Sequence, residues 1–394
     1  MRCFLFVLMF ITSLMSSPSV TGQTTITGTV FEDINHNGTL DEGETGIAGV
    51  TVSDQDQVVV TDAQGFYSLQ GQIPYGILQI CLPDGYLGKF WYPASSRIDF
   101  ALYPSPPQEH YFFVHASDCH MDSLNLPRMA RFRKLLDSIQ PAFVIMTGDL
   151  VRDALRVTEE VASSYYQLNV QEIGKIPFPV FSGVGNHELF GIERDKSLVS
   201  SQHPWYGKNM YRHYLGPDYY AFNYGGLHFL SVDAMEYQNL WYYGGIDTLQ
   251  LSWISRELKQ TESNRPVVTF NHIPLVSPGF SFQEFDEDPF YGPSLLTVDG
   301  HLRHRHVVSD FDALRQAIGT HPFPLALAGH YHAAQSGTFE QSGTQFRQTS
   351  ALTRPDRFTF HGFEIRSGFT VYEVDHARIV GSKFVPLNLP DPKS

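Results

Sequence analysis

Five segments of the 394-residue chain each end an apolar run on side chains that bind metals or move protons. The apolar run before each set is typical of a buried strand. The five segments are SDCH at 117–120, TGD at 147–149, GNH at 185–187, FNH at 270–272 and GHYH at 329–332. A single histidine at a strand end is commonly a hydrogen-bonded structural residue, but five such ends favour one shared site.

The carboxyl ends of parallel strands meet at one edge of an α/β sheet, so these side chains are expected to converge. The candidate ligands are Asp118, His120, Asp149, Asn186, His272, His330 and His332. Mixed oxygen and nitrogen ligands suit Mn, Fe or Zn, whereas calcium takes oxygen ligands. The i, i+2 spacing of the two Asp/His and His/His pairs predicts that both members face the site, because alternate side chains of an extended segment point the same way.

The segments between these ends alternate between apolar strands and amphipathic helices. Residues 128–139 and 247–260 are expected to be helical, the second beginning at Asp247 or Thr248. Gly225 and Gly226 predict a β-hairpin. The last apolar runs, FRQTSALT, GFTVYEVD and ARIVGSKFVPL, are expected to close the second sheet of the same domain.

The ordered motif set D-x-H, G-D, G-N-H-E, H and G-H-x-H resembles the calcineurin-like metallophosphoesterases from about residue 110 to at least 375. The resemblance implies an α/β fold in four layers (α/β/β/α), with two sheets flanked by helices, and a dinuclear centre of divalent or trivalent transition metals. The ligands that it implies are Asp118, His120 and His332 for one ion, Asn186, His272 and His330 for the other, and Asp149 between them. It makes His187 the catalytic histidine rather than a ligand.

Residues after the bridging aspartate depart from the pattern of the family. Calcineurin-type protein phosphatases place an aspartate three residues after the bridging one to orient the catalytic histidine, and here Arg152 holds that position and Asp153 follows. Asp153 is therefore a candidate catalytic residue and Arg152 a candidate phosphate contact, with ordinary surface charge as the alternative for both. No tyrosine follows the G-D pair, which disfavours iron-type purple acid phosphatases. The segment HLRHRH at 301–306 favours a solvated basic patch over a lid in which Arg303 or Arg305 binds phosphate.

Such a site predicts a metal-dependent phosphoric ester hydrolase acting on a small phosphate ester. Two metals lower the pKa of a bridging water, the resulting hydroxide attacks phosphorus in line, and His187 assists the leaving oxygen. We favour phosphodiesters, because the motif set resembles cyclic-nucleotide and glycerophosphodiester hydrolases. A phosphomonoesterase is one alternative, and a surface or cell-wall binding protein with a silent phosphoesterase domain is another. The net charge of −14 disfavours a nuclease and nucleic acid as the main partner.

The beginning of the chain predicts export and a separate module. Residues 1–22 read as a signal peptide, with Arg2 followed by an apolar run, so a secreted or periplasmic protein is expected. No later segment reads as transmembrane. We expect a small antiparallel β-sandwich at 23–103, a proline-rich linker at 104–110, and the phosphoesterase domain with C-terminal strands at 111–394. Cys81 and Cys119 are expected to be unpaired and packed, and the sequence does not indicate an oligomeric state.

The segment DINHNGTLDEGE places oxygen-bearing side chains at the positions of a calcium loop. These residues are Asp33, Asn35, Asn37, Thr39, Asp41 and Glu44, with Gly38 at the sixth position. Residues from about 28 to 69 resemble β-sandwich repeats of the Cna-B or SdrD B kind from bacterial surface proteins, some of which bind calcium in such a loop. A stabilising calcium ion is predicted here, with a metal-free polar turn as the alternative.

Overall fold

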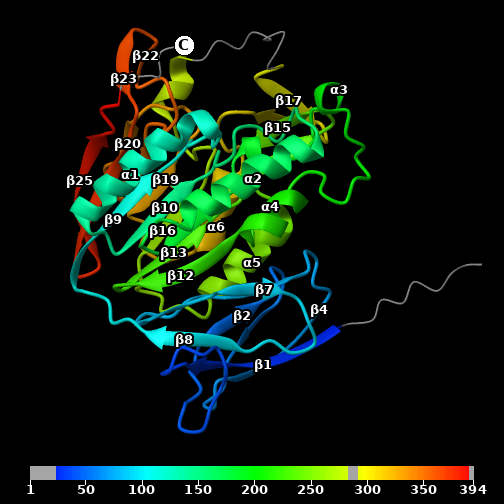
Figure 1. Ribbon diagram of the computed structural model, residues 1–394, viewed down its shortest axis with the longest axis vertical. Helices are drawn as coiled ribbons and strands as arrows, with labels where there is room; N and C mark the ends of the chain where they lie inside the picture. Colours follow the sequence, from blue (N-terminus) through cyan, green and yellow to red (C-terminus); the bar gives the residue numbers. More distant parts are fainter. Residues whose placement is uncertain (1–23, 283–291, 390–394) are drawn as a thin grey trace, which may run out of the picture.

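Two central β-sheets lie face to face in the larger part of the molecule, and a smaller β-module lies below them in Figure 1. The computed structural model describes residues 24–282 and 292–389. The predicted signal peptide lies outside these residues.

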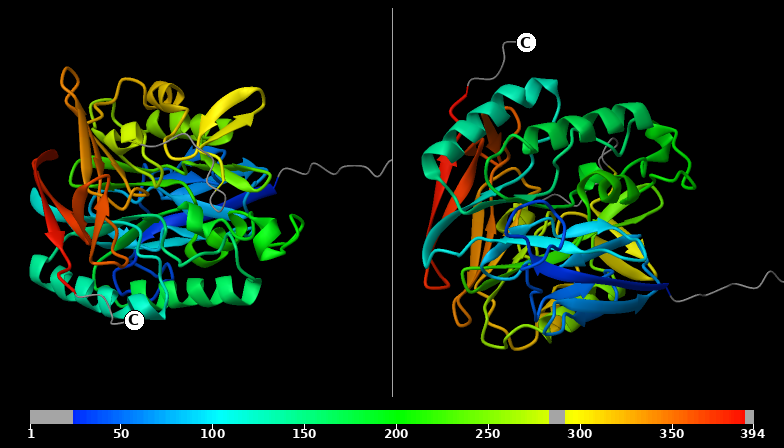
Figure 2. Two further views of the ribbon diagram at one scale, coloured as in Figure 1. Left: turned by 90° about the horizontal axis from the view of Figure 1, so that it is seen from above. Right: turned by 60° about the horizontal axis from the view of Figure 1, so that its bottom comes forward.

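The first central sheet has five strands in the order β11-β10-β9-β24-β25. They are β9 (His110–Ala116), β10 (Phe143–Thr147), β11 (Val180–Gly183), β24 (Gly368–Asp375) and β25 (Arg378–Pro386). Strands β9, β10 and β11 are parallel, and β24 runs antiparallel to β9. Helices α1 (Leu126–Ile139) and α2 (Glu159–Ile173) lie together on the outer face (Figure 2). The predicted face of α1, formed by Met129, Phe132 and Leu136, is buried there.

The second central sheet has six strands in the order β12-β13-β16-β19-β21-β20. They are β12 (Tyr220–Tyr224), β13 (Leu227–Ser231), β16 (Val267–Phe270), β19 (Leu325–Ala328), β20 (Gln335–Phe339) and β21 (Thr344–Gln348). Strands β12 and β13 form the predicted hairpin. Helices α5 (Thr248–Leu258) and α6 (Phe311–Ile318) cover the outer face, and Asp247 caps α5 through a hydrogen bond to the Gln250 amide.

Stacked aromatic rings fill the space between the two sheets. Phe181 and Phe222 stack with ring centroids 3.6 Å apart, and Phe143 contacts Phe229 at 5.1 Å. Alternate residues of each strand face the other sheet or the helices, so the central strands are buried on both faces. This explains why their sequences are continuously apolar, and the predicted α/β/β/α architecture is confirmed.

The N-terminal module consists of two four-stranded sheets, ordered β4-β1-β8-β6 and β3-β2-β5-β7. Its strands are β1 (Thr24–Glu32), β2 (Thr51–Ser53), β3 (Val58–Val60), β4 (Phe66–Gly71), β5 (Ile77–Ile80), β6 (Tyr86–Gly88), β7 (Trp91–Pro93) and β8 (Phe100–Pro104). Strands β1 and β8 pair in parallel, which corrects the expectation of an entirely antiparallel sandwich. The chain returns through a long excursion before β8, and that connection allows a parallel pair.

The module packs against the edge of the second central sheet. Leu82 forms a bridge with Phe222 of β12, and the Asn223 amide donates to the Leu82 carbonyl at 2.8 Å. The indole of Trp253 on α5 donates to Ser53 of β2 at 2.9 Å, and Thr51 donates to the buried Glu257 carboxylate at 2.7 Å. The module therefore covers a strand edge that would otherwise expose unpaired backbone groups.

The C-terminal runs divide between the two sheets, so the expectation that they all close the second sheet is wrong. Strand β21 does join the second sheet, but β24 and β25 extend the first sheet beside β9. The chain crosses between the sheets through the hairpin of β22 (Arg357–Phe360) and β23 (Phe363–Arg366). Apolar alternation is the same in either sheet, and it therefore does not specify which one a strand joins.

Short elements occupy the long connections. These are η1 (Ser123–Asn125), η2 (Asn186–Glu188), η3 (Pro278–Phe282), α3 (Arg194–Ser197), α4 (Asn209–Leu215), β14 (Met235–Gln238), β15 (Trp241–Gly244), β17 (Leu295–Val298) and β18 (His301–His304). Cys81 and Cys119 are free and buried, as predicted. No helix among the described residues is long and apolar enough to cross a membrane.

Candidate metal centre

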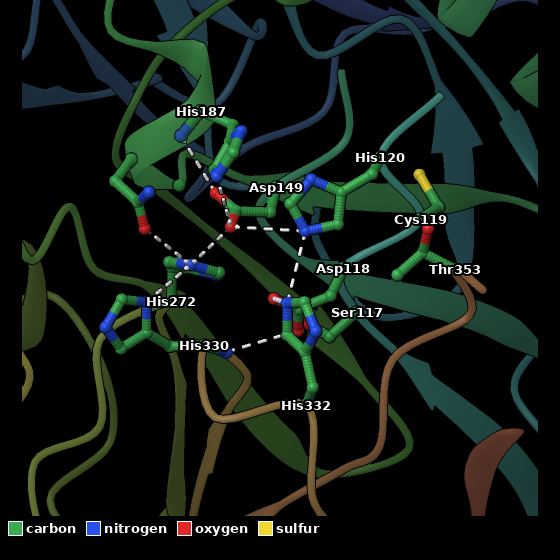
Figure 3. A network of polar contacts seen from close by, with 12 residues as sticks. Ser117, Asp118, Cys119, His120, Asp149, His187, His272, His330, His332 and Thr353 are labelled. Atoms are coloured by element: carbon green, nitrogen blue, oxygen red, sulfur yellow. Dashed lines mark hydrogen bonds and ion pairs between the residues drawn. The ribbon is translucent and has the colours of Figure 1, made fainter. Parts of the chain in front are cut away.

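The carboxyl ends of β9, β10, β11, β16 and β19 meet at one edge of the paired sheets, and the candidate ligands converge there (Figure 3). Asp118, His120, Asp149 and His332 form one group, with ligand atoms that all lie within 4.8 Å of one another. Asp149, His272 and His330 form a second group that meets the same limit. Asp149 belongs to both groups and therefore occupies the place of a bridging ligand.

In the first group, His332 Nε2 lies 3.2 Å from Asp118 Oδ1 and 3.2 Å from His120 Nε2. In the second group, His272 Nε2 lies 3.2 Å from Asp149 Oδ2 and 3.1 Å from the side-chain oxygen of Asn186. Nδ1 of His330 lies 3.2 Å from the same His272 nitrogen. The structure thus brings together all seven predicted ligands.

Hydrogen bonding within the protein leaves part of this cluster unsatisfied. Asp118 Oδ1 is buried and has no hydrogen-bond partner among the described residues. Paired imidazole nitrogens that face each other at 3.2 Å share one hydrogen at most. Buried polar atoms that converge in this way fit cations placed between them, and the mixed oxygen and nitrogen donors fit two transition-metal ions.

Burial and neighbouring charges shift His120 and Asp149 toward their metal-binding forms, whereas they favour the protonated form of His272. Burial, together with nearby His187, lowers the pKa of His120 to about 3, which leaves a neutral imidazole with a free lone pair. Burial opposes ionisation of Asp149, but the adjacent His272 and His187 outweigh it and hold the pKa of Asp149 well below its usual value. Conversely, burial lowers the pKa of His272, but Asp149 outweighs it and raises that pKa to about 9.

Five of the candidate ligands have a left-handed backbone, which corrects the expectation of extended i, i+2 pairs. The φ angles are 52° at Asp118, 41° at His120, 49° at Asp149, 72° at His330 and 56° at His332. Residues other than glycine rarely adopt such angles, and their cost must be balanced by the surrounding structure. The SDCH, TGD and GHYH motifs are therefore tight turns that aim their side chains across the sheet edge, rather than strands with alternating faces.

Two glycines of the motifs are required by close packing at this edge. Gly148 has a φ of +87°, and a Cβ atom there would lie 2.7 Å from the Gly185 nitrogen. A Cβ on Gly329 would lie 1.9 Å from the Ser117 hydroxyl oxygen. Larger residues at either position would push apart the turns that carry the ligands.

Glu188 joins the G-D and G-N-H-E turns, although sequence reasoning assigned it no role. Its buried carboxylate accepts hydrogen bonds from the backbone amides of Asp149, Leu150, Val151 and Gly185, at 2.7–2.9 Å. Its position beside His187 in the motif was a signal that could have identified it. Glu188 fixes the bridging Asp149 relative to the turn that carries Asn186 and His187.

His187 lies beside the cluster and is partly open to solvent, with 22% of its side chain exposed. Its backbone amide donates to Asp149 Oδ1 at 2.9 Å, and its Nδ1 atom donates to the carbonyl oxygen of Arg152 at 2.8 Å. Nε2 lies 3.9 Å from Asp149 Oδ2. The ring therefore presents Nε2 to the site while Nδ1 is held by the backbone.

Asp153 does not contact His187, so the expectation that its carboxylate orients this histidine is wrong. The Asp153 carboxylate accepts from the Leu155 amide at 2.9 Å and from Arg156 at 3.0 Å. The carbonyl oxygen of Arg152 takes the orienting position instead. The Asp153 carboxylate is engaged by Leu155 and Arg156, and a backbone acceptor leaves no signature in side-chain spacing.

The HLRHRH segment is neither a solvated basic patch nor a lid whose arginines face the metal ligands. Arg305 is buried and donates to the Tyr242 carbonyl at 3.2 Å, while Arg303 pairs with Asp310. His306 instead faces the cluster, with Nδ1 located 2.7 Å from His330 Nε2. Sequence reasoning missed this histidine because it lies in a long connection between strands.

The proposed calcium loop is compact and is held together by its own hydrogen bonds. Asp33 accepts from the amides of Asn37 and Gly38 at 3.1 and 2.8 Å, and the side-chain amides of Asn35 and Asn37 both donate to Asp41. Glu44 accepts from the Ile34 and Asp41 amides, and Thr39 donates its amide to the Asn37 side chain. All six predicted residues lie in this one turn.

Comparison with known proteins agrees with the two parts of the fold. The family described as calcineurin-like phosphoesterase matches residues 113–334, and the SdrD B-like domain matches residues 24–87. The mouse (Mus musculus) serine/threonine-protein phosphatase CPPED1 is 24% identical over 216 residues, which cover 51% of this chain and 56% of that protein. The chain thus spans about half the length of the curated relative that it matches.

Solved structures with similarity include a dimetal phosphatase from Danio rerio, at 15% identity and a TM-score of 0.41, covering 67% of this chain and 93% of that one. The purple acid phosphatase PPD1 from yellow lupin (Lupinus luteus) seeds is 14% identical, with a TM-score of 0.42, covering 92% and 69% of the two chains. The shaft pilin SpaA from Lactobacillus rhamnosus GG is 11% identical, with a TM-score of 0.17, covering 25% and 56%.

Proposed function

The chain belongs to the calcineurin-like phosphoesterase family, and from that premise we propose that it hydrolyses phosphodiesters at a dinuclear metal centre. The observation that carries the proposal is the position of Asp149, whose carboxylate is shared by two adjacent groups of ligand side chains. A pair of metal ions held by these two groups would stabilise the charge on the attacking and leaving oxygens.

Metal ions held by Asp118, His120, Asp149, Asn186, His272, His330 and His332 would supply a water of lowered pKa and positive charge to balance the phosphate. Asp149 fixes the spacing of the two ligand groups, and Glu188 holds Asp149 through the backbone of its turn. His187 keeps a proton on Nδ1 through the Arg152 carbonyl and directs Nε2 at the ester. When protonated, Nε2 donates to the leaving oxygen as a general acid.

A diester is favoured by the space beside the ligands. A cavity of about 660 Å³ borders His330 and His332, and its lining among the described residues includes no lysine or arginine. A phosphomonoester carries an extra negative charge, which phosphatases commonly balance with such cations. A diester carries less charge and has a second organic group that would occupy the cavity.

Phosphomonoester hydrolysis is the second candidate, because the matched mouse relative is named a serine/threonine-protein phosphatase. Comparing bis-p-nitrophenyl phosphate with p-nitrophenyl phosphate, each with Mn²⁺ and then with chelator, separates the two. We expect kcat/KM to be higher for the diester, with activity lost on chelation and recovered on adding Mn²⁺. Higher kcat/KM for the monoester would establish the second candidate, and chelator-resistant turnover would refute the dinuclear mechanism.

Export to the periplasm or the medium is part of the proposal and rests on the sequence of residues 1–22. N-terminal sequencing of the mature protein tests it, with cleavage before Gln23 as the expected result. A calcium ion in the Asp33–Glu44 turn is proposed on the ligand spacing described above. A surface-binding protein with a silent catalytic domain is disfavoured, since all seven metal-binding side chains are present and converge.

A further inference from the structure

The cavity beside the candidate metal ligands has an aromatic wall. Gly279, His306, His330, Tyr331, His332, Phe358, Phe360 and His361 line it. Phe358, Phe360 and His361 come from the β22–β23 hairpin, which stands above the sheet edge in Figure 1. Part of this wall therefore comes from a segment outside the five metal-binding turns.

The rings form a continuous series that begins at a metal ligand. The ring centroids of His330 and Tyr331 are 5.7 Å apart, and those of Tyr331 and Phe360 are 6.3 Å apart. Phe360 contacts His361 at 4.6 Å, and His361 stacks on Phe282 at 5.5 Å. A group attached to a phosphate on the metals would thus meet aromatic edges and faces along its whole length.

Charge around the cavity argues against a second phosphate or a carboxylate in this space. The described lining contains no lysine or arginine. Nearby arginines have acidic partners: Arg354 pairs with Asp122 at 3.1 Å, and Arg357 pairs with Glu364 across the hairpin at 2.9 Å. An anionic group would therefore find no cation along this wall, whereas an uncharged ring would find favourable contacts.

The hairpin is held in place by buried contacts at its base. Asp356, just before β22, lies 3.5 Å from Arg128 of α1 and accepts from the Leu389 amide at 3.2 Å. Its carbonyl accepts from the Ser367 amide at 2.9 Å. These contacts fix where the hairpin leaves the sheet edge and so place its rings on the side of the cavity.

On these grounds, and resting on the proposed function, we propose that the substrate carries a planar aromatic group on its phosphoester. That ring is seated against Phe358, Phe360 and Tyr331, which makes the β22–β23 hairpin the specificity-determining element. The shared chemistry is a planar ring, whether a simple aryl group or a nucleobase. The described lining contains no lysine or arginine to bind an anionic group.

The test uses phosphodiesters that share one p-nitrophenyl leaving group and differ in the second ester group: phenyl, thymidine 5′, cyclohexyl or methyl. With the metal-loaded full chain, we expect kcat/KM for the phenyl or thymidine ester, which carries a planar ring, to exceed that for the cyclohexyl ester about three- to tenfold, as aromatic contacts allow. The preferred ring, phenyl or thymidine, identifies the source of the group. Equal values for the phenyl, thymidine and cyclohexyl esters would overturn the proposal.

Variants of the wall sharpen the result. Phe358→Leu and Phe360→Leu keep an apolar surface while removing the ring, so in each variant kcat/KM for the phenyl ester should fall toward that for the cyclohexyl ester. Phe66→Leu, which removes an exposed ring on β4 of the N-terminal module, is the matched control and should leave the preference for planar groups unchanged. Wall variants that keep the full preference would contradict the assignment.

A binding measurement separates this inference from the proposed reaction. We expect phenylphosphonate to bind the metal-loaded protein about three- to tenfold more tightly than methylphosphonate by calorimetry, and the gap to close in Phe360→Leu. This result requires no turnover. Absence of hydrolysis with the binding preference intact would refute the proposed function and support the aromatic wall, whereas equal affinities would refute the wall itself.

Discussion

Two regions of the molecule carry metal-binding residue types, and they are built in opposite ways. The Asp33–Glu44 turn takes its oxygen ligands from neighbouring positions, lies mostly exposed, and satisfies Asp33 and Glu44 with its own backbone amides. The cluster around Asp149 collects side chains from five distant strand ends, buries most of them, and leaves Asp118 Oδ1 without a hydrogen-bond partner among the described residues.

The difference teaches what a cation contributes in each place. The carboxylates of the exposed turn already accept hydrogen bonds from within it, so we expect an ion there to add only a modest increment of stability. The buried cluster has carboxylates and imidazoles that face one another, and cations are the groups that satisfy them. Changes at the cluster should therefore have large effects, and changes at the turn small ones.

Among substitutions outside the metal ligands, the largest effect is expected for His187→Ala. Loss of the proton donor should lower kcat for bis-p-nitrophenyl phosphate about 100- to 10,000-fold, while the metal content stays at the wild-type value because His187 is not a ligand. Steady-state kinetics with elemental analysis checks both. His110→Ala, an exposed histidine paired with Glu373, is the control. Near-wild-type turnover by His187→Ala would remove this residue from the mechanism.

A smaller effect is expected for His306→Ala. The His306 ring fixes Nε2 of His330, which leaves Nδ1 facing the second ligand group, so its loss should weaken binding of one metal ion about 10- to 100-fold. Metal titration into chelated protein measures the affinity. His301→Ala, an exposed position on the same β17–β18 hairpin, should leave it unchanged. Unaltered affinity in His306→Ala would show that the contact does not position the ligand.

Glu257 provides a buried carboxylate outside both regions, at the junction between the module and the second sheet. Burial raises the pKa of Glu257 to about 7, with the Thr51 hydroxyl opposing the shift. The folded state therefore holds this proton more tightly than the unfolded chain. The resulting stabilisation is fully present below the usual pKa and falls by up to about 3 kcal/mol as pH rises through 7.

Glu257→Gln removes the titrating group and keeps an acceptor for Thr51. Relative to the wild type, the variant should gain thermal stability between pH 5 and pH 8, as measured by Tm at both values. Glu262→Gln, which changes an exposed side chain just after α5, should show no such pH dependence. A constant difference in Tm between Glu257→Gln and wild type would contradict the raised pKa.

The smallest effect is expected at the exposed turn. Calcium at about ten times its dissociation constant should add about 1.4 kcal/mol to the stability of the full chain, seen as a small rise in Tm. Asp41→Ala should abolish the rise and leave phosphodiester hydrolysis intact. If added calcium leaves the Tm of the wild type unchanged, the prediction is wrong and the segment is a polar turn without a metal.

Several parts of this account could be predicted from the sequence because they depend on local patterns. The strand ends, α1 and the β12–β13 hairpin follow from periodicity and turn residues, and parallel strand ends explain why distant ligands converge. The sequence was a poorer guide to which sheet each strand joins and to which groups contact each other across the fold. Apolar alternation did not assign β24 to the first sheet, and side-chain spacing did not reveal that a backbone carbonyl at Arg152 holds His187.

The ligand geometry shows the same limit. The i, i+2 spacing correctly paired the ligands, but the reason given for it was wrong, since the φ angles of Asp118 and His332 are left-handed. Tight turns of this kind are maintained by packing, such as the contact of Gly329 with Ser117, and by the buried carboxylate of Glu188. Both depend on segments far apart in the chain.

The most direct measurement of the central claim is the number of transition-metal ions bound by the wild type and by Asp149→Asn, with Asp41→Asn as control. We predict two ions per chain in the wild type and in Asp41→Asn. Asp149→Asn should hold one ion or fewer and lose diester hydrolysis about a thousandfold or more. Two tightly bound ions and undiminished hydrolysis in Asp149→Asn would contradict a bridging role for this carboxylate and, with it, the proposed centre.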